Sequence, residues 1–240
     1  MLEKLKRYNK KSRYSYSFGA FPTIELLRYK SQNAVKVLIS SKFNNREVVE
    51  EIKRICDLNK IEVATDDKTI SRISNKENDY VIGVFEKYTD HIEGANPHVV
   101  LVNPSDSGNV GTIIRSSLGF GIKNIAIIEP AVDIYHPNVV RSSMGALFRV
   151  RIEKFDSFGK YCKMYKNHKK ILFMLDGAKT MEEIRLDKDE LYSLVFGNES
   201  SGLDSSCKKY GEAVFIQHQD TIDSLNLSIA ASIGIYYFTR

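Results

Sequence analysis

The stretch that decides the fold runs from Val102 to Phe120 and reads VNPSDSGNVGTIIRSSLGF. It joins the end of an apolar run to a Gly-rich turn, and the turn opens a helical pattern. Gly108 and Gly111 allow close approach to the backbone, and exposed amides at the start of a helix attract anions. The stretch contains neither a GxGxxG nor a Walker A motif. It predicts one strand-then-helix unit of an α/β fold.

Similar apolar runs recur in the rest of the chain, each followed by Gly, Asn, Asp or Ser and then by a helical pattern. They are His98–Val102, Asn124–Ile128, Ile171–Leu175, Leu194–Phe196 and Ala213–Ile216. Short apolar strands that alternate with helices predict a parallel sheet covered on both faces. Ligands of such sheets bind beyond the carboxyl ends of the strands, so we expect the chemistry there.

The first third of the chain predicts a separate, smaller α/β domain. Three runs have strand character and one has helical spacing: Ala34–Ser40, Ile61–Ala64, Val81–Phe85 and the helix Arg46–Leu58. The stretch Thr89–Pro97 (TDHIEGANP) interrupts both periodicities. We therefore predict an N-terminal domain over 1–92 and a C-terminal domain over 97–240.

Composition restricts the class of protein. Of 240 residues, 42% are hydrophobic and 27% are charged, which is typical of a soluble globular chain. No apolar stretch is long enough to cross a membrane and the first residues are charged, so we expect a cytoplasmic protein with no membrane partner. Cys56, Cys162 and Cys207 lie far apart, and we interpret them as reduced and structural. The histidines have no metal-ligand spacing, so no metal is expected.

Positive charge is concentrated at the N-terminus. The chain carries a formal charge of +5, and Met1–Ser17 contains one acid, Glu3. Cations and tyrosines alternate there: Lys4, Lys6, Arg7, Tyr8, Lys10, Lys11, Arg13, Tyr14 and Tyr16. Cations suit phosphates and rings suit bases, but a solvated tail has the same composition, and the two interpretations stay open. A second group, Lys160, Lys163, Lys166 and Lys169, is spaced to share one face of a helix.

Two later segments place polar side chains directly after predicted strands. Leu194–Leu203 (LVFGNESSGL) carries Glu199, which could face a ligand or cap a helix near Asp204. Phe215–Phe238 (FIQHQDTIDSLNLSIAASIGIYYF) leads through a polar loop into an apolar helix. Asp223 or Ser224 is a plausible cap for this helix, and capping could also be the only role of Ser224 or Asn226. Arg115 lies among apolar residues of its predicted helix, so we expect its charge to have a partner.

Together these three segments resemble the signature motifs of the SpoU (TrmH-like) RNA 2′-O-ribose methyltransferases of the SPOUT superfamily. The resemblance spans roughly Pro97 to Arg240, and Val139–Arg149 (VVRSSMGALFR) is similar to a segment those enzymes carry between the first and second motifs. Tyr16–Leu27 (YSFGAFPTIELL) is similar to the start of the family's small RNA-binding domain of ribosomal-protein-like α/β fold.

The resemblance implies a C-terminal domain with a deep trefoil knot. The sequence pattern alone would not predict a knot, because knots are nearly absent from proteins. It implies a homodimer that uses S-adenosylmethionine, releases S-adenosylhomocysteine and completes its active site across the subunit interface. The implied catalytic residues are Asn109, Arg115, Glu199, Ser224 and Asn226. The implied cofactor-binding residues are Phe196, Gly197, Asn198, Gly202, Ile216, Gln217 and Leu225.

The chemistry demands alignment of a ribose 2′-hydroxyl with the methyl donor and removal of one proton. A guanidinium rarely deprotonates, so we expect Arg115 to clamp the adjacent phosphate and polarise the hydroxyl. Ser224, Asn226 and Glu199 would order the site and pass the proton towards water. The chain departs from the family pattern at Ser117, Ser200, Gln217, His218 and Asp220.

Two other functions compete with methyl transfer. A non-catalytic RNA-binding protein could keep the fold, and the altered third motif favours that interpretation. A dinucleotide-binding protein is disfavoured because the GxGxxG turn and an acidic ribose ligand are missing. The small N-terminal domain favours ribosomal RNA over tRNA as the substrate, whereas the basic leader is shared with tRNA-directed relatives.

Overall fold

The computed structural model describes residues 5–74, 76, 78–219 and 221–240. The first residues of the basic leader, including Glu3 and Lys4, and the departure at Asp220 therefore lie outside the described residues. Contacts divide the chain into two units, one of residues up to Tyr88 with Asp133–Arg149, the other of Thr89–Val132 with Val150–Arg240. Our division into 1–92 and 97–240 is continuous along the chain and stays a prediction.

The first unit contains a four-stranded sheet in the order β1–β4–β2–β3. Its strands are β1 (Tyr14–Phe18), β2 (Ala34–Ile39), β3 (Glu62–Thr65) and β4 (Val81–Glu86). Its helices are α1 (Ala20–Tyr29), α2 (Arg46–Asn59), α3 (Asp67–Ile73) and α5 (Pro137–Ser142). One apolar cluster lies between the helices α1 and α2 and the face of the sheet that carries Val37 and Ile39. A second cluster lies between α3 and the opposite face, which carries Leu38. The strands and the helix predicted here are found within two residues of their predicted ends.

Asp133–Arg149 reaches this unit through ionic contacts, although it follows β5 and β6 of the second unit along the chain. Arg141 donates two hydrogen bonds, of 3.0 and 2.8 Å, to the buried carboxylate of Asp79. Phe148 meets Phe85 edge to face at 5.2 Å. The segment VVRSSMGALFR thus packs with the N-terminal sheet, although in the sequence it lies between the first and second motifs of the other unit.

The second unit confirms the predicted parallel sheet. Seven strands pair in parallel in the order β7–β6–β5–β10–β8–β11–β9. They are β5 (His98–Val102), β6 (Asn124–Ile128), β7 (Arg151–Phe155), β8 (Lys169–Phe173), β9 (Lys179–Thr180), β10 (Tyr192–Phe196) and β11 (Glu212–Phe215). Sequence reasoning missed β7 and β9, which lie at the two edges of the sheet. Edge strands keep polar residues, so they lack the continuous apolar run of central strands.

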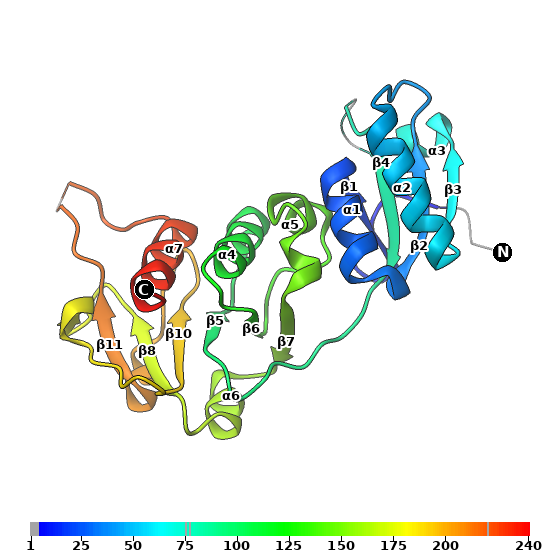
Figure 1. Ribbon diagram of the computed structural model, residues 1–240. Helices are drawn as coiled ribbons and strands as arrows, with labels where there is room; N and C mark the ends of the chain where they lie inside the picture. Colours follow the sequence, from blue (N-terminus) through cyan, green and yellow to red (C-terminus); the bar gives the residue numbers. More distant parts are fainter. Residues whose placement is uncertain (1–4, 75, 77, 220) are drawn as a thin grey trace. The chain divides into compact units, whose positions relative to one another are not determined.

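Helices cover both faces of this sheet (Figure 1). Helix α6 (Phe158–Met164) packs on the face that carries Val100 and Val195. Helix α7 (Leu227–Phe238) covers the other face so closely that a Cβ at Gly234 would lie 2.5 Å from the Phe173 ring. Helix α4 (Ser107–Gly119) lies beside α7, and Ser116 and Ser232 share a hydrogen bond of 2.7 Å.

The lysine group predicted on one helix face is not on one helix. Helix α6 ends at Met164, and Lys169 belongs to β8, where it lies 3.3 Å from Glu212. Tyr165–His168 forms a turn instead of another helical turn, because Lys169 must enter the sheet beside β10. The four lysines therefore form no common surface stripe along a helix.

The order of the strands in the sheet places the carboxyl ends of four strands side by side, at the edge where we expect a ligand. Strand β10 lies between β5 and β8, so its carboxyl end is flanked by theirs, and β11 follows on the far side of β8. The loops after these four strands therefore leave the same edge of the sheet (Figure 1). The knot itself stays a prediction.

A buried polar cluster occupies the opposite ends of the same strands. His98 is fully buried, and its imidazole hydrogen-bonds the Tyr161 hydroxyl at 2.8 Å and the Glu93 carbonyl at 3.0 Å. The ring of His168 lies 4.3 Å from it, and the buried ammonium of Lys170 donates to the His168 carbonyl at 2.7 Å. Burial lowers the pKa of His98 to about 4 and also lowers the pKa of His168.

This cluster predicts loss of stability in mild acid. The pKa of histidine in an unfolded chain is about 6.5. Between roughly pH 6.5 and 4, His98 is therefore protonated in the unfolded chain and neutral in the folded protein. Stability is complete above that window and falls as the pH approaches 4. We expect His98 to contribute about 3 kcal/mol to this fall, at about 1.4 kcal/mol per pKa unit. Urea unfolding of wild type from about pH 7.5 to about pH 4.5 measures it.

His98→Gln should flatten the pH dependence in that window, because the amide does not titrate. His91→Gln, which changes an exposed histidine, is the matched control and should keep the wild-type dependence. An unchanged dependence in His98→Gln would contradict the assignment.

Candidate functional site

The site begins at the turn between β5 and α4. Asn103 follows the last residue of β5 with a φ of 53°, in the left-handed region that Asn tolerates, and this reverses the chain direction. Asp106 then caps α4 by accepting a hydrogen bond of 2.7 Å from the amide of Asn109. The amides of Ser105 and Asp106 stay outside the helix and need another acceptor.

Glu199, from the loop after β10, supplies that acceptor. Its carboxylate accepts hydrogen bonds of 3.0 Å from the amides of Ser105 and Asp106 and one of 2.7 Å from the Ser105 hydroxyl. The amide of the Asn109 side chain lies 3.5 Å from the same carboxylate. Glu199 thus joins the loops after two neighbouring strands. It does not cap the helix near Asp204, because Asp204 itself accepts from Ser206 there at 2.8 Å.

The environment of Glu199 keeps it ionised. Burial acts to raise the pKa of Glu199, but the hydrogen bonds from Ser105 and Asp106 outweigh burial and lower the pKa below its ordinary value. An ionised carboxylate with most of its lone pairs occupied is a poor proton acceptor at neutral pH. Its geometry suits positioning of the β5–α4 turn.

The loop after β10 folds back on itself at Gly197–Gly202. Asn198 and Gly202 exchange backbone hydrogen bonds of 3.1 and 2.9 Å, and the Asn198 side chain accepts from the amides of Ser200 and Ser201 at 2.9 and 3.2 Å. A Cβ at Gly197 would lie 2.2 Å from the backbone of Gly202. Only glycine fits there, so this loop has one compact shape with its backbone exposed to a ligand.

Asn226 connects the third loop to the first. It caps α7 by accepting from the amide of Ser228 at 2.8 Å, and its side-chain amide donates to the side-chain oxygen Oδ1 of Asn109 at 3.1 Å. Of the three caps that the sequence suggested, Asp223, Ser224 and Asn226, the structure shows Asn226, because α7 begins at Leu227. Asn226, Asn109 and Glu199 form one hydrogen-bonded chain across three loops.

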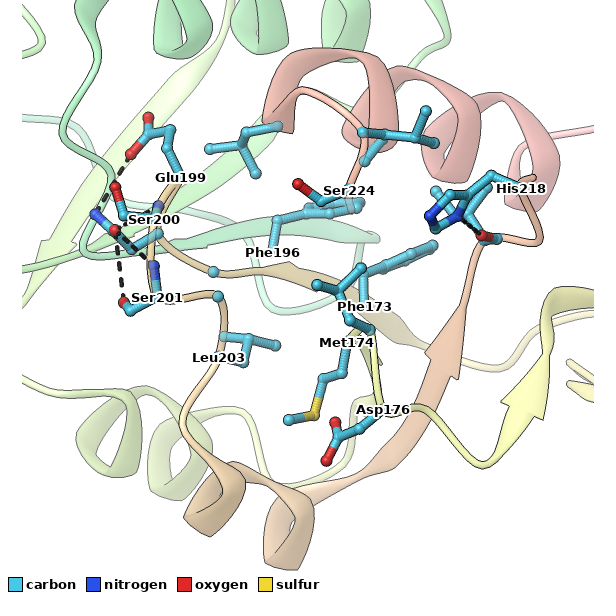
Figure 2. Close-up of a pocket in the computed structure, with 18 of the residues that line it drawn as sticks. Phe173, Met174, Asp176, Phe196, Glu199, Ser200, Ser201, Leu203, His218 and Ser224 are labelled. Atoms are coloured by element: carbon cyan, nitrogen blue, oxygen red, sulfur yellow. Dashed lines mark hydrogen bonds between the residues drawn. The ribbon is translucent and has the colours of Figure 1, made fainter. Parts of the chain in front are cut away.

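A cavity of about 380 Å³ lies beside this chain and is enclosed by the loops after β8, β10 and β11. The rings of Phe173 and Phe196, stacked at 4.4 Å, form an apolar wall. Figure 2 shows Ser224 over this wall, with Glu199 and His218 at opposite ends of the cavity. The His218 imidazole hydrogen-bonds the Ile216 carbonyl at 2.8 Å. The cavity therefore offers an apolar slot with polar groups at its rim, the usual form of a small-molecule site.

Most of the predicted cofactor-binding residues line the cavity. These are Phe196, Gly197, Asn198, Gly202, Ile216 and Leu225. Gln217 is exposed and is not part of the lining, because the extended backbone after β11 turns the next side chain, His218, inward instead. Of the predicted catalytic residues, Glu199 and Ser224 line the cavity, while Asn109 and Asn226 lie next to it through their hydrogen bonds.

Arg115 behaves differently from our expectation. Its side chain is exposed, and its guanidinium has no ion-pair or hydrogen-bond partner among residues 5–74, 76, 78–219 and 221–240. The apolar neighbours Ile113 and Ile114 face the sheet, so Arg115 takes the solvent side of α4 and needs no internal partner. The structure does not bring it into the chain of Asn109, Glu199 and Asn226.

Several lining residues were missed by sequence reasoning. The loop after β8 contributes Met174, Leu175 and Asp176, and the third loop contributes Leu227. The carboxyl-end rule was sufficient to find the first three, since their strand was predicted and Asp176 follows it. Among the described residues, no three His, Cys, Asp or Glu side chains gather as metal ligands. No helix in the described chain is long and apolar enough to cross a membrane.

Gly197→Ala tests the close packing of the loop after β10. The added methyl group would overlap the backbone of Gly202, which cannot move without breaking the Asn198–Gly202 hydrogen bonds. We expect a melting temperature at least about 5 °C below that of wild type. Gly119→Ala is the matched control, because an added Cβ there meets nothing within 4 Å. Equal melting temperatures for the two variants would contradict the packing.

Known proteins resemble this chain in sequence and fold. The 23S rRNA (uridine(2479)-2′-O)-methyltransferase of Streptomyces viridochromogenes is 28% identical over 148 residues, which are 59% of this chain and 52% of that enzyme. The chain thus spans about half the length of that curated relative.

Solved structures match more of the chain. The SpoU methyltransferase AviRb of S. viridochromogenes, in complex with AdoMet, superposes with a TM-score of 0.82 at 21% identity, covering 97% of this chain and 93% of that one. The AdoMet-bound rRNA methyltransferase of Sinorhizobium meliloti gives 0.79 at 22% identity, covering 94% and 86%. The model of the SpoU rRNA methylase family matches residues 96–236. The chain belongs to the SpoU rRNA methylase family.

Proposed function

We propose that this protein transfers a methyl group from S-adenosylmethionine to a ribose 2′-hydroxyl of RNA. One observation carries the proposal: in a SpoU-family chain, the second and third motif loops and the loop after β8 enclose one cavity, and Glu199, Asn109 and Asn226 form a hydrogen-bonded chain that ties the first motif loop beside it. A non-catalytic RNA-binding protein would have no need of both features. The intact geometry of the third loop at Asn226 also argues against that alternative.

The cavity fits the proposed cofactor. Its volume is within the usual range for small-molecule sites, roughly 300–1,000 Å³. The apolar slot of Phe196, Ile216 and Leu225 suits a flat, weakly polar base, and the Gly197–Gly202 turn leaves backbone groups open to hydrogen bonds. Asp176 at the rim carries a carboxylate that pairs with Lys208 at 2.6 Å. S-adenosylmethionine, when bound, supplies an electrophilic methyl group and yields S-adenosylhomocysteine.

The chain's own residues would align and polarise the ribose. Glu199 fixes the β5–α4 turn as an ionised carboxylate, and Asn226 fixes Asn109. The Ser224 hydroxyl faces the cavity and is a candidate to receive the hydroxyl proton and pass it to water. Arg115 stays cationic, so it clamps the phosphate next to the target ribose and polarises the 2′-hydroxyl.

The exposed position of Arg115 supports a shared active site in a homodimer. Helix α7, which packs beside α4, carries exposed apolar side chains: Ile229, Ile233 and Tyr236. The exposed ring of Phe120, the residue after α4, lies 5.4 Å from that of Tyr236. Ile229 is 51% exposed and Tyr236 is 47% exposed, which is unusual for a contiguous helix face in a monomer. A twofold axis through this face would bury it and present Arg115 of each subunit to its partner's cavity.

Ribosomal RNA is the substrate we favour. The S. viridochromogenes relative and the RlmP enzyme of Bacillus subtilis are both named for 23S rRNA. The solved structure named as an rRNA methyltransferase matches 94% of this chain, whereas a structure concerned with C/U34 of tRNA matches 59% of it. We place the protein in the cytoplasm, where it would meet ribosomal RNA.

Calorimetric titration with S-adenosylmethionine tests the cofactor. Wild type should bind it, and Leu225→Pro should weaken binding at least about tenfold, because proline removes the backbone N–H in the cavity lining. Leu225→Ala keeps that N–H and should retain most of the affinity. Transfer of labelled methyl to ribosomal RNA, located as alkali-resistant 2′-O-methyl positions, then tests the reaction. Cofactor binding without any transfer would favour the non-catalytic alternative.

Mixed dimers test the shared site. Arg115→Ala and Glu199→Gln should each lose methyl transfer while remaining folded, since neither change leaves a buried charge unpaired. If Arg115 serves the partner's cavity, a heterodimer of the two variants has one intact site. An equal mixture after subunit exchange should then recover about a quarter of wild-type activity. No recovery would place Arg115 and Glu199 in the same subunit's site.

A further inference from the structure

The part of the basic leader that the structure describes, Leu5–Arg13, belongs to the first unit. Residues Leu5–Arg13 (LKRYNKKSR) form neither helix nor strand, yet side chains from the sheet and α3 hold their carbonyl oxygens. Arg72 Nε donates to Leu5 O at 3.0 Å, Tyr16 Oη to Lys6 O at 2.5 Å and Lys87 Nζ to Lys10 O at 2.8 Å. The leader's main chain is therefore fixed without using the side chains of Lys6, Lys10 and Lys11.

Tyr8 anchors the middle of the leader. Its hydroxyl donates to the Asp133 carboxylate, its ring meets His136 edge to face at 5.6 Å, and the Lys87 ammonium lies 4.6 Å from its centroid. Leu5 and Tyr8 also pack against the apolar cluster beneath α3. The apolar side chain of Leu5 and the ring of Tyr8 thus face the protein.

The cations of the leader face solvent. The segment has five of them and no acid: Lys6, Arg7, Lys10, Lys11 and Arg13. A turn closed by the hydrogen bond from Ser12 N to Asn9 O, 2.9 Å long, places Lys10 and Lys11 at its tip. Arg13 pairs with Glu86 at 2.8 Å. Within the described chain, the ammonium groups of Lys6, Lys10 and Lys11 have no acidic partner.

Holding several unpaired cations in an ordered segment costs free energy. Like charges repel, and a leader of this composition gains more entropy when it is free in solvent. Fixing its backbone lowers the entropy lost when an anion binds, so the arrangement favours a ligand with several negative charges at regular spacing. In a chain of the SpoU rRNA methylase family, RNA is the polyanion that meets this description.

We propose that Leu5–Arg13 is a preformed phosphate-binding strip that holds the RNA substrate. The proposal rests on the proposed function and adds which surface of the first unit touches RNA. Lys6, Lys10 and Lys11 contact backbone phosphates, so the strip contributes affinity and little sequence preference.

The test replaces the three unpaired lysines together, as Lys6→Gln, Lys10→Gln and Lys11→Gln. The probe is a fluorescent, single-stranded RNA of mixed sequence, about 20 nucleotides long, titrated at several salt concentrations. Each lost phosphate contact lowers the salt slope by about 0.7, so the slope should fall by about 2 and affinity at about 0.1 M salt roughly 100-fold. An unchanged circular dichroism spectrum and melting temperature report that the first unit of the variant is folded, and unchanged S-adenosylmethionine binding reports the same for the second unit.

A second triple variant controls for net charge. Lys42→Gln, Lys53→Gln and Arg54→Gln remove the same charge from exposed positions elsewhere on the first unit. This control should keep the wild-type slope. Tyr8→Phe removes the hydroxyl that binds Asp133 and keeps every cation, so it should weaken RNA binding severalfold with an unchanged slope.

The outcomes separate the two proposals. If wild type binds no RNA, the proposed function fails together with the strip. If wild type binds RNA and both triple variants weaken it equally, only the strip is overturned and net charge explains the binding. If the leader variant loses affinity for phosphatidylserine vesicles but not for RNA, the strip binds membranes and the proposal is wrong. An unaffected Tyr8→Phe would overturn the claim that the strip is preformed.

Discussion

The carboxylate of Glu199 is the group on which the site depends. It satisfies two backbone amides and one hydroxyl in the turn between β5 and α4, although it comes from the loop after β10. These strands are neighbours in the sheet and nearly 100 residues apart in sequence. Without this carboxylate, the amides of Ser105 and Asp106 would lose the acceptor that joins the two loops. The carboxylate therefore fixes the loops after two neighbouring strands relative to each other.

The rest of the site extends from this connection. Asn109 reaches both Glu199 and Asn226, so the start of α4 is held to the start of α7. The cavity lies where these loops leave the sheet, against the stacked rings of Phe173 and Phe196. Gly197 and Gly234 allow the backbone to approach where a Cβ would overlap its neighbours. Packing and hydrogen bonding thus leave room for a ligand without leaving the loops loose.

Charge is distributed differently in the two units. In the second unit, Arg115 is exposed and lies apart from the chain of Glu199, Asn109 and Asn226. In the first unit, buried acids are paired with cations of the inserted segment, as Asp79 is with Arg141. The leader's cations, by contrast, stay open to solvent above an anchored backbone. Internal charges therefore stabilise the units, and the unpaired cations are those we assign to RNA.

The sequence by itself determined the parallel sheet and the positions of the motif loops. Central strands such as His98–Val102 are buried on both faces, so they appear in the sequence as continuous apolar runs. The end of each run then gives the position of the loop that follows it. Only the tertiary structure decided which side chains meet. Sequence spacing does not reveal that β10 lies between β5 and β8, that Asn226 also binds Asn109, or that Arg115 faces solvent. Nor does it place Asp133–Arg149 with the first unit, because that position depends on Arg141 finding Asp79, 62 residues away.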